Sequence, residues 1–275
     1  MNATIWTAFS IPCRCPISRS WNSTPNRGTW PRTSPTASRS GRCCAIWSTP
    51  GRRANYGSRG RLMSNENDHS WLKQGSTSAA DVAKNYDDWA STYNDDLVDW
   101  DYRSPAAAAR LLQAMVSSDA TILDAGCGTG LTGSALKAAD FTGPIDGTDI
   151  SQASLDEAGT HGVYRNLRQA DMQKLPLDFA DDVYDGLICI GVLTYVPDSG
   201  GVLREFARMV RPGGAVVISQ RSDLFQERAF AKTIKGLTEA GIYAEATITE
   251  PQPYLPGNPD FGTEIEVLYV AMIVA

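Results

Sequence analysis

The chain has 275 residues, of which 25 are basic and 31 acidic, and its 42% hydrophobic content is enough for one sizeable core. Residues 1–62 contain ten of the basic residues, all Arg, and no acidic residue, so the remainder has 15 basic and 31 acidic residues, a net charge of −16. Such an acidic domain repels nucleic-acid backbones, which argues against an enzyme that grips long DNA or RNA. No apolar run reaches the roughly 18 residues of a transmembrane helix, so no membrane span is predicted.

Residues 1–62 form an Arg-, Ser- and Pro-rich segment that we predict to be disordered, because no helical or strand period would bury its tryptophans. Its composition is compatible with an organelle transit peptide, a basic nucleic-acid arm or a non-native extension. We favour the last, because Met63 begins a stretch, MSNENDHSWLKQ, typical of an ordinary acidic start. Residues 63–79 are expected to be a flexible lead-in to a single domain at 80–275.

The cysteines indicate a reducing compartment. Four of the six lie before residue 63 and lack the spacing of zinc ligands, which leaves Cys127 and Cys189 in the folded part. Two isolated thiols suit a reducing environment. We therefore expect a cytoplasmic protein without a metal site, or an organellar one if residues 1–62 are a genuine transit peptide.

From residue 80 onward, helical and strand patterns alternate, which is typical of a parallel sheet covered by helices on both faces. An aromatic stripe at helical spacing, including Tyr86, Trp89 and Tyr93, predicts a helix over 80–97, and a second helix is predicted over 105–116. Runs of Ile, Leu and Val predict buried strands. The five strand candidates are 121–125, 144–149, 163–169, 183–192 and 215–220.

The C-terminal part adds helices and a closing hairpin. Leu203, Phe206, Ala207 and Val210 mark a helix that we expect to end at the Pro-Gly-Gly of 212–214. A further helix is predicted over 224–240. Strands are predicted at 243–249 and 264–273, joined by the Pro-rich loop EPQPYLPGNPDFG. The predicted fold is α/β, a Rossmann-like seven-stranded, mostly parallel sheet with helices on both faces and an antiparallel C-terminal strand.

The stretch ILDAGCGTG at 122–130 runs from a strand into glycines and then into a helix beginning near Leu131. Glycines let the backbone turn sharply there and let a ligand lie against it, beneath the helix N-terminus. Residues 128–133 also satisfy the dinucleotide pattern G-x-G-x-x-G, a weak signal by itself. Asp124, two residues before Gly126, would repel a pyrophosphate and attract an ammonium group. This favours S-adenosylmethionine, which carries an α-ammonium and a sulfonium and no phosphate.

Two further carboxylates follow the next strands. Asp149 ends the second strand, where it can accept hydrogen bonds from both ribose hydroxyls of either NAD or S-adenosylmethionine. Ser151 supplies the cap of the following helix. After the third strand, Asp171 can accept a hydrogen bond from an adenine amino group while Met172 packs on the ring. A solvated loop carboxylate beside a core methionine is an equal alternative.

Several segments together resemble the successive motifs of the class I S-adenosylmethionine-dependent methyltransferases. They are residues 122–130, GTDIS at 147–151, ADMQKLPL at 170–177, YDGLICIGVLTYV at 184–196 and RPGG at 211–214. The resemblance covers residues 80–275. Within this superfamily, AKNYDDWASTYNDDL at 83–97 resembles the Williams-Beuren syndrome region 27 methyltransferase-like group.

The resemblance implies that the glycines cradle the methionine part of the cofactor, that Asp149 holds the ribose, and that Asp171 with Met172 frames the adenine. It also implies that the N-terminal aromatic helix closes over the cofactor. There Trp89 and Tyr93 either face the sulfonium or simply pack within the helix. The predicted cofactor-binding residues are Trp89, Tyr93, Asp124, Gly126, Cys127, Gly128, Gly130, Asp149, Ile150, Asp171, Met172 and Ile190.

The expected reaction is methyl transfer by in-line displacement to a small molecule or a protein side chain. It needs little acid-base help, because the leaving thioether is neutral, so a catalytic base is not required. Tyr195, after the fourth strand, is the candidate for orienting the acceptor, with packing under the next helix as an equal alternative. A nicotinamide-dependent oxidoreductase and an inactive S-adenosylmethionine-binding protein are the alternative functions.

Overall fold

The computed structural model describes residue 69 and residues 71–75, 78–261 and 264–275. The chain divides into two units, Met1–Gly60 and Arg61–Ala275, and every described residue belongs to the second. The segment 1–62 and Met63, about which the sequence made predictions, lie outside the described residues.

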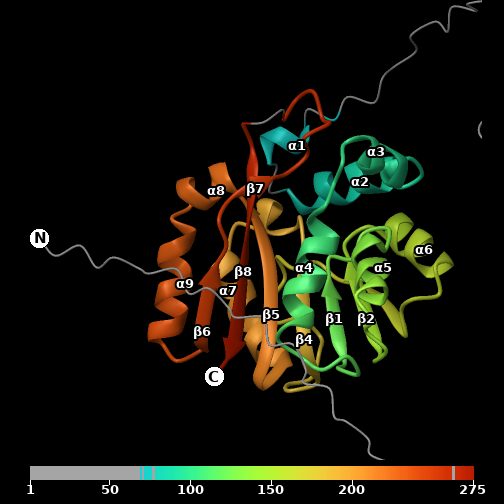
Figure 1. The fold of residues 1–275 in the computed structure, drawn as a ribbon. Helices are drawn as coiled ribbons and strands as arrows, with labels where there is room; N and C mark the ends of the chain where they lie inside the picture. Colours follow the sequence, from blue (N-terminus) through green and yellow to red (C-terminus); the bar gives the residue numbers. More distant parts are fainter. Residues whose placement is uncertain (1–68, 70, 76–77, 262–263) are drawn as a thin grey trace, which may run out of the picture. The chain divides into compact units, whose positions relative to one another are not determined.

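The second unit contains one mixed sheet (Figure 1). Its strands lie in the order β3-β2-β1-β4-β5-β8-β6, and β7 pairs with β8. The pairs from β3 to β5 are parallel, whereas β8 runs antiparallel to β5, β6 and β7. The strands are β1 (Ile122–Ala125), β2 (Ile145–Asp149), β3 (Asn166–Gln169), β4 (Tyr184–Cys189), β5 (Val210–Arg221), β6 (Tyr243–Ile248), β7 (Gln252–Pro253) and β8 (Glu266–Val274).

This sheet confirms the predicted Rossmann-like α/β fold with an antiparallel C-terminal strand, but it has eight strands rather than seven. The additional strand, β7, is a two-residue pairing inside the predicted Pro-rich loop. Proline is tolerated at such an edge position, and so short a strand has no periodicity to detect. Strand β5 also begins earlier than predicted, at Val210, which was assigned to the preceding helix.

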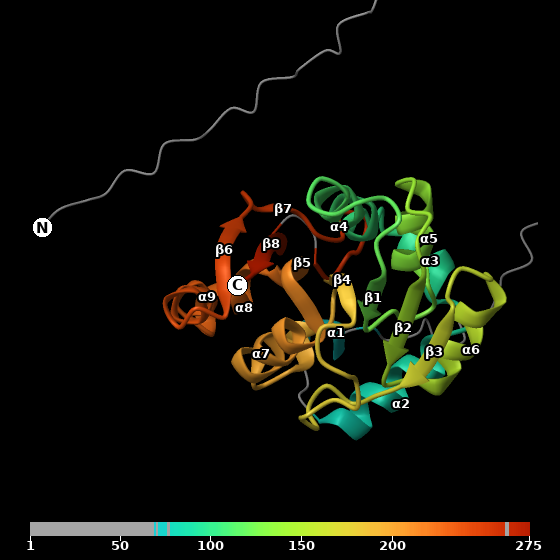
Figure 2. The same ribbon diagram turned by 90° about the horizontal axis from the view of Figure 1, so that it is seen from below.

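Helices cover both faces of the sheet, and α6 packs against β2 and β3. Helices α4 and α5 pack on one face and α7 and α9 on the other (Figure 2). None of the described helices is long and apolar enough to cross a membrane. The helices are α1 (Trp71–Gln74), α2 (Ala79–Trp89), α3 (Tyr93–Asp99), α4 (Ser104–Gln113), α5 (Leu131–Ala138), α6 (Gln152–Thr160), the 3-10 helix η1 (Leu193–Tyr195), α7 (Ser199–Met209), α8 (Ser222–Glu227) and α9 (Phe230–Glu239).

Two predicted helices are each divided in two. The helix predicted over 80–97 forms α2 and α3, separated at Thr92, whose hydroxyl donates to Asp96 instead of supporting a continuous helix. The helix predicted over 224–240 forms α8 and α9, separated at Ala229, which has a φ of 48°. The spacing of apolar residues along the sequence does not reveal a break caused by one strained residue.

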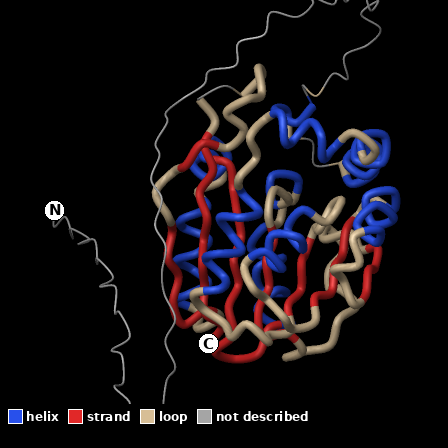
Figure 3. The backbone as a smooth tube through the Cα atoms, turned by 45° about the vertical axis from the view of Figure 1, so that its right-hand side comes forward, coloured by secondary structure: helices blue, strands red, loops and turns tan. Residues whose placement is uncertain are grey.

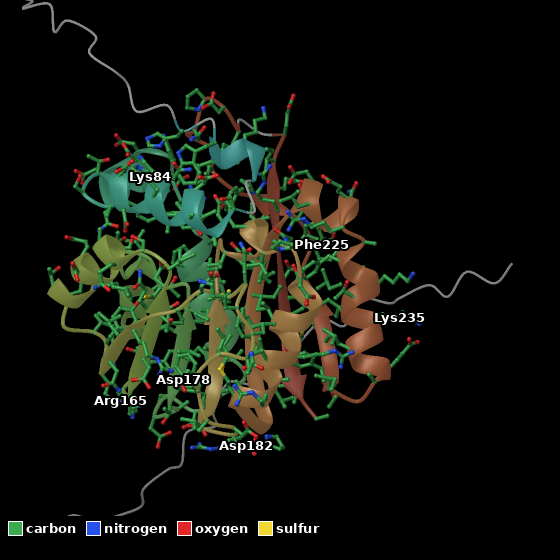
Figure 4. All side chains as sticks on the ribbon, turned by 180° about the vertical axis from the view of Figure 1, so that it is seen from behind. Lys84, Arg165, Asp178, Asp182, Phe225 and Lys235 are labelled. Carbon is green, nitrogen blue, oxygen red and sulfur yellow. The ribbon has the colours of Figure 1, made fainter. Side chains whose placement is uncertain are left out.

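The lead-in predicted at 63–79 contains α1 and the start of α2. Leu72 is buried, and the Arg221 guanidinium donates to its carbonyl oxygen at 2.7 Å. We call α1, α2 and α3 the cap, because they lie over the carboxyl ends of the parallel strands (Figure 3). The inner side of the cap is aromatic. On its outer side Lys84 forms an exposed ion pair with Asp88 (Figure 4).

Candidate cofactor and acceptor site

The loop between β1 and α5 turns sharply because of its glycines. Gly126, Gly128 and Gly130 have φ values of 80°, 51° and 95°, in the left-handed region where residues with a Cβ are strained. The amides of Gly126 and Cys127 donate to the carbonyl oxygen of Thr148 at 2.7 and 2.9 Å. The loop is therefore fixed at the carboxyl ends of two adjacent strands.

Asp149 lies at the end of β2, against this loop. Its Oδ2 accepts a hydrogen bond from the Gly128 amide at 2.8 Å, and its Oδ1 accepts one from the Ser151 amide at 2.9 Å. Burial raises the pKa of this carboxyl, and the backbone donors oppose that rise. Each carboxylate oxygen can accept a further hydrogen bond, which leaves capacity for ligand hydroxyls. Ser151 caps α6 as predicted, since its hydroxyl accepts from the Ser154 amide at 3.0 Å.

Asp124 is fully buried at the end of β1. Its Oδ2 accepts from the Tyr164 hydroxyl at 2.7 Å, and that hydroxyl oxygen accepts from the Gly133 amide at 3.1 Å. The other oxygen, Oδ1, is buried and has no hydrogen-bond partner within the described part of the chain. Burial raises the pKa of Asp124 to about 7, with the Asp149 carboxylate adding to the rise and Tyr164 opposing it.

Neither carboxyl forms an ion pair within the part of the chain that the structure describes. The nearby charged groups that affect their pKa values, Asp149 for Asp124 and Asp87 for Asp149, are themselves acidic. Buried carboxylates are costly unless a cation or enough donors accompany them. This pair therefore favours a positively charged ligand over an anionic one.

A pocket lies beside these groups, between the strand ends and the cap. Many of the predicted site residues line it, and four of them do not. Those that do are Tyr93, Gly126, Gly128, Asp149, Ile150, Asp171, Met172, Ile190 and Tyr195. Those that do not are Trp89, Asp124, Cys127 and Gly130.

Local packing explains why Cys127 and Gly130 lie away from the pocket. The Cys127 side chain is buried against Gly147, where an added Cβ would lie 3.0 Å from the sulfur. Burial also raises the pKa of this thiol. Gly130 precedes α5, and an added Cβ would lie 3.3 Å from Ala158 of α6. Its lack of a side chain lets α5 and α6 approach each other.

Trp89 packs inside the cap, whereas Tyr93 faces the pocket. The Trp89 indole donates to the Asp96 carboxylate at 2.6 Å, and its ring lies 4.5 Å from the Tyr93 ring and 5.6 Å from the Trp100 ring, measured between centroids. The predicted aromatic stripe therefore serves both roles. Trp89 packs within the cap, which was one of the two alternatives, and Tyr93 lines the pocket, which was the other.

The segments after β3 and β4 complete the predicted set. Asp171 accepts from the Gln173 amide at 2.9 Å and lies 3.4 Å from the Lys174 ammonium. The η1 segment that carries Tyr195 is held by Arg228, whose guanidinium donates to the carbonyl oxygens of residues 193, 194 and 196. Both segments are thus fixed by contacts outside the pocket.

Sequence reasoning missed several lining residues. Tyr86 belongs to the same aromatic stripe as Tyr93 and could have been inferred from it. Tyr254 lies in the Pro-rich loop, which the sequence placed near the expected pocket without selecting a residue. Tyr102 and Val192 carried no local signal, because they reach the pocket only through the tertiary fold.

Polar contacts join the cap to the segments that follow β1, β2 and β4. Asp87 of α2 accepts from the Ser151 hydroxyl at 2.5 Å, after β2. Asn94 of α3 accepts from the Thr129 hydroxyl at 2.6 Å, in the glycine loop. The Tyr86 and Tyr195 hydroxyls are 3.3 Å apart, after β4. The cap is therefore attached beside each of three strands that border the pocket.

Comparison with known proteins agrees with this geometry. The family described as "Methyltransferase domain" matches residues 123–218, which include the glycine loop, Asp149 and Asp171. Human methyltransferase-like protein 27 is 31% identical over 164 residues, 58% of this chain and 66% of that protein. The similarity to known proteins therefore lies with methyltransferases, and the family match spans the sheet from β1 to β5. The narrower resemblance of residues 83–97 to the Williams-Beuren syndrome region 27 group fits this relative.

The match to a second curated relative covers less of this chain. The ubiquinone biosynthesis O-methyltransferase of Alkalilimnicola ehrlichii is 36% identical over 103 residues, which is 36% of this chain and 40% of that protein. The chain thus spans less than two thirds of the length of these curated relatives. A Haloferax volcanii complex between the Trm112 methyltransferase activator and a methyltransferase has a TM-score of 0.50 at 20% identity, covering 70% of this chain and 97% of that one. This last similarity supports the fold alone.

The pocket fits S-adenosylmethionine, the cofactor predicted from the sequence. Asp149 retains acceptor capacity for the ribose hydroxyls, and the unpartnered Oδ1 of Asp124 calls for a donor such as an ammonium group. Met172 and Ile190 supply apolar surface for a flat ring. No group of three His, Cys, Asp or Glu side chains in the described ranges is placed to share a metal ion.

Proposed function

We propose that this chain transfers the methyl group of S-adenosylmethionine to a small molecule or a protein side chain by direct in-line displacement. One observation carries the proposal: Asp124 and Asp149 are buried at the ends of adjacent strands, and among the described residues neither carboxyl forms an ion pair with Lys, Arg or His. A ligand with an ammonium and a sulfonium relieves this imbalance, whereas the pyrophosphate of a nicotinamide cofactor would increase it.

The side chains of the pocket bind and orient rather than exchange protons. S-adenosylmethionine, when bound, supplies an activated methyl group whose leaving thioether is neutral. Among the described residues lining the pocket there is no His, Cys, Lys or Glu to act as a general base. Burial raises the pKa of Tyr195 to about 12, so its hydroxyl stays protonated at neutral pH and can only orient the acceptor.

Replacing Asp149 by Asn is expected to weaken binding of S-adenosylhomocysteine by about tenfold, because a buried charged hydrogen bond contributes roughly 1.5–3 kcal/mol. Isothermal titration calorimetry measures this change. The matched control is Asp178→Asn, which changes an exposed carboxylate outside the pocket (Figure 4) and should leave the affinity unaltered. Binding of NADH in place of S-adenosylhomocysteine would overturn the cofactor assignment.

Turnover separates an enzyme from an inactive binding protein. The full chain is incubated with labelled S-adenosylmethionine and with metabolite, protein and RNA fractions of a cell extract. Label should enter the metabolite or protein fraction, and the Asp149→Asn variant should transfer less. Cofactor binding without label in any fraction would instead favour the inactive binding protein.

We further propose a cytoplasmic location. The two cysteines within the described ranges, Cys127 and Cys189, are free and buried, which is compatible with a reducing compartment. Fractionation of cells that express the full chain tests this location.

A further inference from the structure

Tyrosine dominates the part of the pocket away from the glycine loop. Five tyrosines line it, and they come from α2, α3, the segment before α4, η1 and the loop after β7. In chain order they are Tyr86, Tyr93, Tyr102, Tyr195 and Tyr254. Aromatic walls bind flat apolar bodies, and tyrosine adds a hydroxyl that can donate or accept one hydrogen bond.

Two of these hydroxyls converge on Gly191, which follows β4. An added Cβ at Gly191 would lie 3.2 Å from the Tyr102 hydroxyl oxygen and 3.8 Å from that of Tyr254. The two rings meet edge to face, with centroids 5.8 Å apart. Gly191 has a φ of 79°, so the turn that admits both hydroxyls depends on a residue without a Cβ.

The same region lacks positive charge. Within the part of the pocket lining that the structure describes there is no Lys, Arg or His, and its charged groups are Asp149 and Asp171. The cation that influences Tyr195 and Tyr254 is Arg221. Its guanidinium is engaged by the Asp223 carboxylate at 2.6 Å and by the Leu72 carbonyl at 2.7 Å. A carboxylate or phosphate on the acceptor would therefore be buried without a counter-charge.

Because no general base lies among the tyrosines, only certain kinds of acceptor atom can attack the methyl group there. The carboxylates of Asp149 and Asp171 border the cofactor side, and the tyrosine hydroxyls hold their protons because burial raises their pKa values. A hydroxyl acceptor would need to lose its proton before it attacks, whereas an uncharged nitrogen already has a free lone pair. The positive charge that develops on such a nitrogen interacts favourably with tyrosine faces.

We propose that the methyl acceptor is a small uncharged aromatic amine or nitrogen heterocycle, bound among Tyr102, Tyr195 and Tyr254 beside Gly191. This inference rests on the proposed methyl transfer. The acceptor nitrogen forms the new bond to the methyl carbon with its lone pair, and the carbon–sulfur bond breaks with its electrons remaining on sulfur. The positive charge passes from sulfur to the acceptor nitrogen. An amine then loses a proton from that nitrogen to water, an imidazole-type ring loses the proton of its other ring nitrogen, and a ring nitrogen without such a proton keeps the charge as an N-methyl cation.

The test compares matched probes on the full chain saturated with S-adenosylhomocysteine. Ligand-observed NMR measures binding of benzimidazole, which is uncharged at pH 7.5, and of benzimidazole-5-carboxylate, which is anionic. We expect the uncharged probe to bind at least about tenfold more tightly, because an unpaired buried carboxylate costs more than 1.4 kcal/mol. Equal or tighter binding of the carboxylate would overturn the inference, as would no binding of the uncharged probe.

Two variants connect this preference to the tyrosine wall. Tyr254→Ala should weaken benzimidazole binding while the affinity for S-adenosylhomocysteine stays within about twofold. Tyr254→Lys should reverse the preference toward the carboxylate, since it supplies the missing counter-charge. Retained S-adenosylhomocysteine binding shows that each variant is folded, and an unchanged probe preference in both would contradict the assigned position.

Turnover tests the nitrogen assignment. With labelled S-adenosylmethionine, at least one probe among benzimidazole, quinoline and 2-aminoquinoline should accept the methyl group, and 2-naphthol should not. Transfer to 2-naphthol alone, or to none of the nitrogen probes, overturns the assignment. If S-adenosylhomocysteine itself does not bind, the proposed function fails before the acceptor inference is reached.

Discussion

Replacing Gly126 by Ala is expected to lower the free energy of unfolding by about 2–5 kcal/mol. An added Cβ would lie 2.2 Å from Cγ2 of Val192, a branched side chain that has little freedom to move. The φ of 80° adds about 1–2 kcal/mol of strain for any residue with a Cβ. Urea unfolding monitored by circular dichroism measures this loss.

Gly128→Ala is the matched control in the same loop. Gly128 has a φ of 51°, so it shares the strain, but an added Cβ would have no protein atom within 4 Å. Its cost in stability should therefore be only about 1–2 kcal/mol. Because Gly128 lines the pocket, the methyl group should nevertheless weaken S-adenosylhomocysteine binding. Equal stability losses in the two variants would contradict the packing described for Val192.

Replacing Asp124 by Asn is expected to stabilise the ligand-free protein at pH 8 while weakening S-adenosylhomocysteine about 10- to 100-fold. The folded-state pKa of about 7 lies above the ordinary aspartate pKa of 3.8, so between these two pH values the folded protein holds a proton that the unfolded chain releases. Stability of the natural protein therefore falls as pH rises from about 4 to about 7 and levels off above that. With Asn at position 124, stability no longer falls as the pH rises. The substitution also removes the negative charge that we expect to hold the ammonium group of the cofactor.

Thermal unfolding and calorimetry across pH 5–8.5 check both halves of this prediction. The stability advantage of Asp124→Asn should shrink as the pH falls, because the carboxyl of the natural protein then becomes protonated as well. The matched control is Tyr164→Phe, which removes the hydroxyl that donates to Asp124 and keeps the carboxyl. Ligand affinity of Asp124→Asn equal to that of the natural chain would exclude Asp124 from cofactor binding.

The sequence predicted those parts of the site that depend on local chemistry. The glycine turn, the position of Asp149 and the Ser151 cap each follow from what a few consecutive residues need. Tyr102 and Tyr254 could not be predicted in this way, because they approach Gly191 only in the tertiary fold. Tyr254 depends on the pairing of β8 with β5, which brings the Pro-rich loop to the strand ends, and Tyr102 on the placement of the segment before α4. Periodicity predicted the helices but not their interruptions.

The buried Asp124 carboxyl also links ligand binding to proton release. With a pKa of about 7, this group is about half protonated at neutral pH in the ligand-free protein. A cation placed against its unpartnered oxygen favours the ionised form, so part of a proton enters the buffer whenever the cofactor binds. The heat of binding should accordingly differ between phosphate and Tris at pH 7, and that difference should vanish in the Asp124→Asn variant. The site would then release one positive charge, the proton, when it binds another, the cationic group of the cofactor.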